Sequence, residues 1–127
     1  MALVALALPV LSGCLSVLPY DVKVSDGALL VPREMADTLR GPTDVLELRA
    51  EGRSFYLRRL PDGSFSALSS LCTHRSCQIG AEADGYVCPC HGSRYDLTGR
   101  VVDGPAERPL PRYQVDTTSA GLRIIAG

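Results

Sequence analysis

Two short stretches of the chain hold both of its histidines and four of its five cysteines. They read CTHRSC over residues 72–77 and CPCHGS over residues 88–93, and they are called the first box and the second box below. In each box a histidine follows the first cysteine, two positions later in the first box and three in the second. Thiolates and imidazoles are the ligands that soft and borderline metals prefer. The pattern predicts one metal centre, with four candidate ligands: Cys72, His74, Cys88 and His91.

Two simpler interpretations of the cysteines stand beside this one. A zinc site built from two cysteines and two histidines is chemically sound, but structural zinc sites usually show closely spaced pairs of cysteines. Each pair here joins a cysteine to a histidine, and zinc would leave Cys77 and Cys90 without a role. A pure disulfide framework with incidental histidines is the other alternative.

The two boxes resemble the cluster-binding loops of the Rieske iron-sulfur family. The resemblance implies a [2Fe-2S] cluster, with Cys72 and Cys88 on one iron and His74 and His91 on the other. Neutral imidazoles in place of two thiolates make the oxidised site less negative, so the addition of an electron is opposed less. The outer nitrogens of the imidazoles also hold protons whose affinity rises on reduction, which suits a quinol donor.

Further residues match the high-potential branch of the family, found in quinol-oxidising cytochrome bc complexes. The resemblance implies a disulfide between Cys77 and Cys90. It also implies that hydroxyls of Ser93 and Tyr95 donate hydrogen bonds to a cluster sulfide and to a ligating sulfur, which raises the potential. Residues 104–106 (GPA) resemble the start of a proline-containing loop that covers the cluster from a third side.

The first box departs from the family pattern. Quinol-docking members usually read CTHLGC, whereas this chain has Arg75 and Ser76 in place of leucine and glycine. A guanidinium is costly to desolvate in an apolar quinol pocket. The departure favours a redox partner with an acidic surface, unless Arg75 folds back onto a nearby carboxylate.

The N-terminal segment predicts export and anchoring. Residues 1–20 carry no charged side chain, and residues 2–11 form an apolar run broken only by Pro9. The run has the length of a secretory signal core and is short for a membrane span, which takes about 20 residues. It ends in LSGC, which resembles the bacterial lipobox, so Cys14 is the predicted lipidation site.

This predicts a leader over residues 1–13 and a short tether over residues 14–20. The alternatives are an incidental cysteine in a leader or anchor, and a short membrane helix that continues to Leu18. No lysine or arginine precedes Lys23, although a leader normally begins with positive charge. A start upstream of Met1, with room for a twin-arginine signal, would explain this.

Composition fits one small exported domain over residues 21–127. A net charge of −1 and a pI near 6.1 give no electrostatic case for nucleic acid as a partner. A stable disulfide needs an oxidising compartment, which predicts the periplasmic or outer face of a bacterial cytoplasmic membrane.

The pattern of short alternating segments predicts an all-β fold, expected as strands over residues 21–24, 28–31, 44–49, 54–59, 64–68, 113–117 and 122–125. Only residues 33–39, after Pro32, suit a helical turn. The family resemblance implies a Rieske fold: an antiparallel, barrel-like base with an inserted cluster-binding subdomain, here about residues 70–106, whose two loops carry the boxes.

These observations predict a membrane-tethered, high-potential [2Fe-2S] electron-transfer protein that passes electrons from quinol to a cytochrome c type acceptor. The chain shows no substrate pocket signature, so we expect an electron-transfer subunit of an oxidoreductase complex without a catalytic site of its own. One alternative is the iron-sulfur small subunit of a periplasmic oxidase, similar to arsenite oxidase. Another is a non-redox zinc-binding lipoprotein. Ferredoxins of ring-hydroxylating oxygenases fit less well, because that branch generally lacks the loop cysteines.

Overall fold

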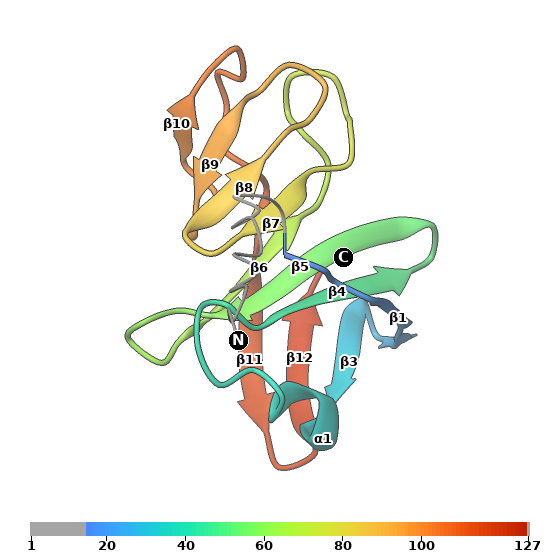
Figure 1. Cartoon of the computed structure of the whole chain (residues 1–127). Coiled ribbons are helices and arrows are strands. Elements are labelled where there is room, and N and C mark those ends of the chain that lie inside the picture. The colour runs from blue at the N-terminus through green and yellow to red at the C-terminus, as the bar shows by residue number, and fades with distance from the viewer. Residues whose placement is uncertain (1–14, 127) are drawn as a thin grey trace, which may run out of the picture.

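The computed structural model describes residues 15–126, which form short strands and one turn of helix (Figure 1). The elements are β1 (Pro19–Asp21), β2 (Lys23–Ser25), β3 (Ala28–Pro32), α1 (Arg33–Ala36), β4 (Val45–Ala50), β5 (Arg53–Arg59), β6 (Phe65–Ser69), β7 (Gly80–Glu82), β8 (Gly85–Val87), β9 (Arg94–Asp96), β10 (Val101–Asp103), β11 (Arg112–Thr118) and β12 (Gly121–Ile125). The predicted all-β class is confirmed.

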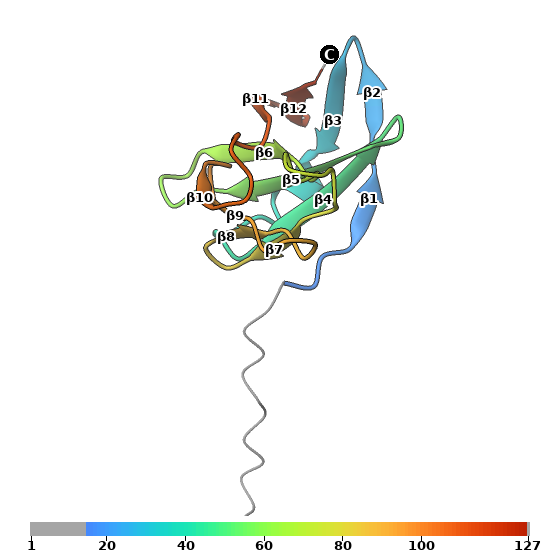
Figure 2. The same ribbon diagram turned by 90° about the horizontal axis from the view of Figure 1, so that it is seen from above.

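The base of the molecule is an eight-stranded sheet with the order β1-β4-β5-β6-β11-β12-β3-β2. Strands β1 and β2 follow each other in the chain yet lie at opposite edges, so the sheet curls into a nearly closed barrel (Figure 2). The one parallel pair in this sheet is β1 with β4, and the other neighbours are antiparallel.

A second sheet, of four strands in the order β10-β9-β8-β7, is inserted between β6 and β11. It stands at one end of the base (Figure 1). The first box lies between β6 and β7, and the second box lies in the turn between β8 and β9. The expected two-loop insertion is therefore present, but its loops are carried by a sheet of their own, whose three-residue strands give little periodicity in the sequence.

Local sequence explains the turns of the base. The predicted hairpin forms between β11 and β12, and its Gly121 has a φ of 146°. A Cβ at Gly121 would lie 2.0 Å from the carbonyl oxygen of Val31, so no larger residue fits there. Helix α1 begins directly after Pro32, as expected. It is one turn long and ends at Ala36, three residues before the end of the segment predicted to be helical.

Arg58 joins the base to the inserted sheet. Its side chain is fully buried in β5, and its guanidinium donates to backbone carbonyls on both parts of the molecule, those of Pro42, Glu82 and Gly85. The guanidinium also lies 5.1 Å from the ring centroid of Tyr86 in β8. A buried charge is tolerated when it is well hydrogen-bonded, and here each guanidinium nitrogen donates to a backbone carbonyl, without a carboxylate.

The described part of the predicted tether lies against the domain. The amide of Leu15 donates to the carbonyl of Ala81 in β7 at 2.6 Å, and Val17 packs on the hydrophobic cluster beneath the inserted sheet. Among residues 15–126, no helix is long and apolar enough to cross a membrane. The predicted leader and the predicted lipidation site at Cys14 lie outside the described residues.

Candidate metal centre

The two boxes share one backbone conformation. The amide of Cys72 donates to the carbonyl of Cys77, and that of Cys88 to Ser93, both at 2.7 Å. The carbonyls of the same two cysteines accept from Ser76 and Gly92, both at 2.8 Å. Matched turns on two adjacent loops present their first cysteines to a common centre.

Each of these turns needs one residue with positive φ. In the first box it is Ser76, with a φ of 56°, and in the second it is Gly92, with a φ of 78°. Glycine adopts this conformation freely, whereas serine does so at a cost. The serine noted in the sequence as a departure from the family pattern therefore occupies the strained position of its loop.

Cys72 and Cys88 are buried and reduced, and each thiol affects the pKa of the other. Backbone amides surround both. The amide of His74 lies 3.4 Å from the sulfur of Cys72, and those of Cys90 and His91 act on Cys88. Amides directed at sulfur favour the thiolate, which is the form that binds a metal.

The two thiols differ in acidity. Burial raises the pKa of Cys88. Burial acts in the same direction on Cys72, but hydrogen bonds from the Tyr95 hydroxyl and from backbone amides outweigh it and lower the pKa of Cys72 below its ordinary value. Cys72 is therefore the more readily ionised of the pair.

The histidines lie at the surface. His74 and His91 are exposed, and their ring centroids are 5.1 Å apart with the rings edge to face. The four candidate ligands thus come together as two buried thiols below two exposed imidazoles. Such a set can hold two metal atoms, one on the thiol side and one on the imidazole side.

The two loops are joined by a disulfide between Cys77 and Cys90. The sulfur atoms of these two residues and of Cys88 lie within 4.8 Å of one another. Two of the three are oxidised in the disulfide, so this group is not itself a metal site. The disulfide stands beside the centre as a covalent brace between its loops.

Tyr95 lies beside the first box, with its hydroxyl 3.3 Å from the sulfur of Cys72. The same oxygen accepts from the amide of Thr73 at 3.3 Å. Tyr95 is buried in β9, so its hydroxyl is held in place. When Cys72 is a thiolate, this hydroxyl is the donor, because a thiolate has no hydrogen to donate.

Ser93 is fully buried, and its oxygen accepts from the amide of Ala106 at 3.0 Å. This leaves its own hydrogen free to be donated. The bond also ties the second box to the proline-containing loop predicted at residues 104–106.

That loop borders the centre. Thr73 and His74 face it across a cavity of about 480 Å³, which is completed by Pro105, Glu107 and Arg108. The hydroxyl of Thr73 donates to the carbonyl of Arg108 at 2.7 Å. No local motif predicts this contact, because it joins segments far apart in the chain.

The residues present fit a [2Fe-2S] cluster with mixed ligation. Two adjacent thiols with amides directed at sulfur suit one iron, and two neighbouring imidazoles suit the other. Hydroxyl donors lie beside these four ligands. Cys77 and Cys90 are used in the disulfide, so Cys72 and Cys88 are the only free cysteines among the described residues that could bind iron. The assignment of each ligand to an iron stays a prediction.

Comparison with known proteins agrees with this fit. The family model for the Rieske [2Fe-2S] domain matches residues 22–114. The chain is 36% identical over 94 residues to the cytochrome b6-f complex iron-sulfur subunit of Prochlorococcus marinus subsp. pastoris, covering 72% of this chain and 48% of that one. It is 40% identical over 74 residues to the mitochondrial cytochrome b-c1 complex subunit Rieske of Saccharomyces cerevisiae, covering 54% of this chain and 33% of that one. The chain thus spans half or less of the length of these relatives.

Solved structures show the same fold. The cyanobacterial plasma membrane Rieske protein of Synechocystis PCC 6803 superposes with a TM-score of 0.58 at 30% identity, covering 63% of this chain and 84% of that one. A chain in the complex of oxygenase and ferredoxin of carbazole 1,9a-dioxygenase gives a TM-score of 0.65 at 20% identity, covering 80% and 95%. The second likeness concerns the fold alone.

Proposed function

Because the chain belongs to the Rieske [2Fe-2S] family, we propose that it is a membrane-tethered, high-potential electron carrier on the outer face of a bacterial cytoplasmic membrane. It is an iron-sulfur electron-transfer protein, and the cofactor is a [2Fe-2S] cluster rather than the zinc of the alternative interpretation. The proposal is that it accepts electrons from quinol, or from a quinol-oxidising partner, and passes them to a cytochrome-type acceptor.

One observation carries this proposal. The two imidazoles of His74 and His91 are exposed side by side, whereas the thiols of Cys72 and Cys88 are buried. When bound, the cluster supplies the one-electron chemistry. The exposed imidazole edge is where a docked partner can reach the centre, and its outer nitrogens can hold or release a proton there.

The other residues around the centre serve its potential and its integrity. Hydroxyl donors at Tyr95 and Ser93 favour the more negative, reduced state. The Cys77–Cys90 disulfide holds the two loops together. No residue in this arrangement needs to act on a substrate of its own, which suits a redox subunit.

The proposed ligands can be tested one at a time. Alanine at Cys72, His74, Cys88 or His91 should abolish the visible absorption of the cluster, since each supplies a quarter of the protein ligation. Thr73→Ala is the matched control, because Thr73 lies between two proposed ligands and should leave the absorption in place. A His91→Ala protein that keeps its chromophore would overturn the assignment.

The proposed electron donor and anchor need a separate experiment. Membranes from a bacterium that expresses the full chain are separated from the soluble fraction, and reduction of the cluster by added quinol is followed by electron paramagnetic resonance. The proposal expects a signal in the membranes that grows on quinol addition and is lost from them in Cys14→Ser. An equally membrane-bound Cys14→Ser protein would exclude the lipid anchor.

A second candidate function is the iron-sulfur small subunit of a periplasmic oxidase. The exposed side chain of Arg75 beside the histidines favours it, since an apolar quinol pocket would not accept this charge. Reduction by the substrate of a neighbouring oxidase subunit, with no response to quinol, would support this candidate.

A further inference from the structure

Gln78 lies at the neck of the first box, directly after the disulfide cysteine Cys77. It forms an isolated bridge with Leu71, on the chain that enters the loop. The next residue, Ile79, donates its amide to the carbonyl of Ser70 at 2.9 Å. The loop is therefore entered and left through one narrow, hydrogen-bonded neck.

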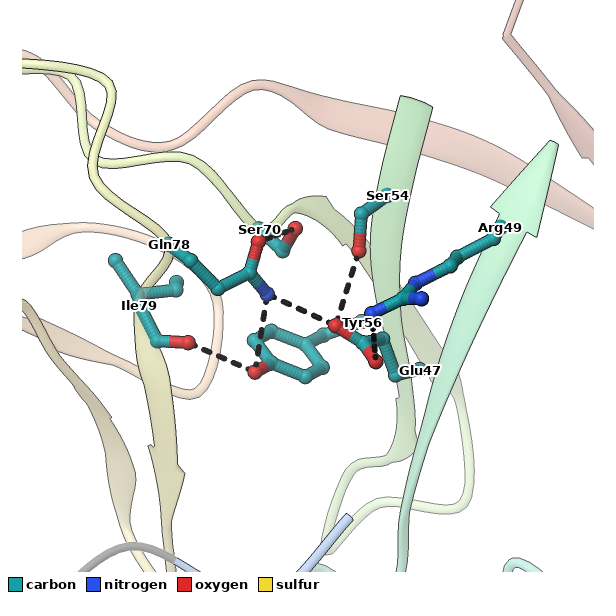
Figure 3. A network of polar contacts seen from close by, with 7 residues as sticks. All are labelled: Glu47, Arg49, Ser54, Tyr56, Ser70, Gln78 and Ile79. Atoms are coloured by element: carbon teal, nitrogen blue, oxygen red, sulfur yellow. Dashed lines mark hydrogen bonds and ion pairs between the residues drawn. The ribbon is translucent and has the colours of Figure 1, made fainter. Parts of the chain in front are cut away.

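The side-chain amide of Gln78 is held on both sides (Figure 3). Its nitrogen donates to a carboxylate oxygen of Glu47 at 2.9 Å and lies 3.4 Å from the hydroxyl of Tyr56. Its oxygen accepts from the hydroxyl of Ser70 at 3.1 Å. The amide therefore has one orientation that satisfies all its neighbours.

These neighbours belong to the rigid base. Glu47 is buried in the middle of β4, between β1 and β5, and its carboxylate also accepts from Ser54 of β5 at 3.2 Å. Arg49 pairs with it at 3.5 Å. Tyr56 of β5 donates to the carbonyl of Ile79 at 2.7 Å. A buried carboxylate is a strong acceptor, so the contact from Gln78 to Glu47 is charge-assisted.

We propose that Gln78 is a positioning residue for the cluster and that Glu47 is its anchor. The pair fixes the neck of the first box to the base, and the amide of Cys72 and the carbonyl of Cys77 carry that position across the box at 2.7 Å. Cys72 and His74 are thereby held in register with the second box. The inference rests only on membership of the family and its cluster, and not on the donor, the partner or the membrane.

The test uses the full chain with its cluster and a set of matched variants. Gln78→Ala removes the contact, and Glu47→Ala removes its anchor. Glu47→Gln keeps an oxygen that can accept from Gln78 but removes the charge. Gln114→Ala is the control, because Gln114 is also exposed and donates to a carboxylate, that of Asp116, but lies on β11 of the base.

Two properties are measured: the rate at which the visible absorption is lost at raised temperature, and the g-values and line widths in electron paramagnetic resonance. Gln78→Ala and Glu47→Ala should each lose the cluster about tenfold faster, equivalent to ~1.4 kcal/mol, with broadened resonances. Glu47→Gln should fall between wild type and Glu47→Ala, because it keeps an acceptor for Gln78 but not the charge. Gln114→Ala should remain close to wild type. The double variant Glu47→Ala with Gln78→Ala should be no worse than Glu47→Ala alone, because Glu47→Ala already removes the contact with Gln78, together with those to Ser54 and Arg49.

A second measurement separates positioning from folding. In Gln78→Ala and Glu47→Ala, hydrogen exchange of the Ile79 amide should become faster, while exchange in the β11–β12 hairpin stays unchanged. Equal cluster loss and equal spectra in Gln78→Ala and Gln114→Ala would overturn the proposal. Additive losses in the double variant would overturn it too, as they would show that the two residues act separately.

Discussion

Ser76 and Gly92 occupy the same place in two matching turns, and both have positive φ, 56° and 78°. Serine is strained there by about 1 kcal/mol relative to glycine. We predict that Ser76→Gly raises the free energy of unfolding by up to about 1 kcal/mol and that Gly92→Ser lowers it by a similar amount. A Cβ at Gly92 meets no protein atom within 4 Å, so the expected cost within the protein is backbone strain. Urea midpoints of the cluster-loaded proteins check this, and an unstable Ser76→Gly protein would contradict it.

The hydroxyl of Tyr95 should raise the potential through its contact with Cys72. We predict that Tyr95→Phe and Ser93→Ala each lower the midpoint potential by roughly 40–90 mV, if each bond is worth about 1–2 kcal/mol more to the reduced state. Redox titration followed by electron paramagnetic resonance measures this. Tyr86→Phe is the control. Tyr86 pairs with Tyr95 across the sheet, but its buried side chain interacts with Arg58 and not with a candidate ligand, so loss of its hydroxyl should leave the potential unchanged. Unchanged potentials in both test variants would show that the hydroxyls point elsewhere.

The Cys77–Cys90 disulfide should protect the cluster rather than form it. In Cys77→Ser the cluster is expected to assemble but to be lost more readily, since a cross-link over a loop of this length contributes about 3 kcal/mol at most. The decay of visible absorption measures this loss. The double variant Cys77→Ala with Cys90→Ala is the control for effects of the free thiol that Cys77→Ser leaves. Cluster lifetimes equal to wild type in both variants would rule out a protective brace.

Arg58 should be the most sensitive position outside the centre. The guanidinium of Arg58 donates at the same time to a carbonyl of the base and to carbonyls of the inserted sheet, and the single ammonium group of lysine cannot reach both. Arg58→Lys should therefore lower the free energy of unfolding by about 3 kcal/mol. The exposed Arg112→Lys change on β11 is the matched control and should cost little. Denaturant titration distinguishes them, and similar midpoints for the two variants would refute this role for Arg58.

Local patterns in the sequence predicted most strands of the base and marked four candidate ligands that the fold brings together, but they did not predict the contacts that hold these parts in place. The β11–β12 hairpin was evident because alternation and a turn glycine at Gly121 are local signals. The pairing of β1 with β4 was not, since it joins segments far apart in the chain. Arg58 and Gln78 carry no motif either. Each acquires its role only when folding brings distant backbone carbonyls or a buried carboxylate to it.

Arg75 tests what kind of partner docks at the centre. Its side chain is exposed, and the two ion pairs among residues 15–126, Arg49 with Glu47 and Arg94 with Glu82, do not involve it. It therefore does not fold back onto a carboxylate, and its positive charge stands next to His74. Placed there, the charge should favour the reduced cluster and attract an acidic partner.

We predict that Arg75→Leu lowers the midpoint potential and weakens the dependence of electron transfer on ionic strength, because one screened attraction is removed. Arg40→Leu is the matched control, since it removes the same charge from an exposed position that follows α1 in the chain. Helix α1 lies at the end of the base opposite the inserted sheet (Figure 1). Stopped-flow rates with the physiological partner at several salt concentrations measure the effect. Equal salt dependence in Arg75→Leu and wild type would show that Arg75 takes no part in docking. Faster oxidation of quinol by Arg75→Leu would instead show that the site favours an apolar partner, because the leucine restores the side chain usual in quinol-docking members.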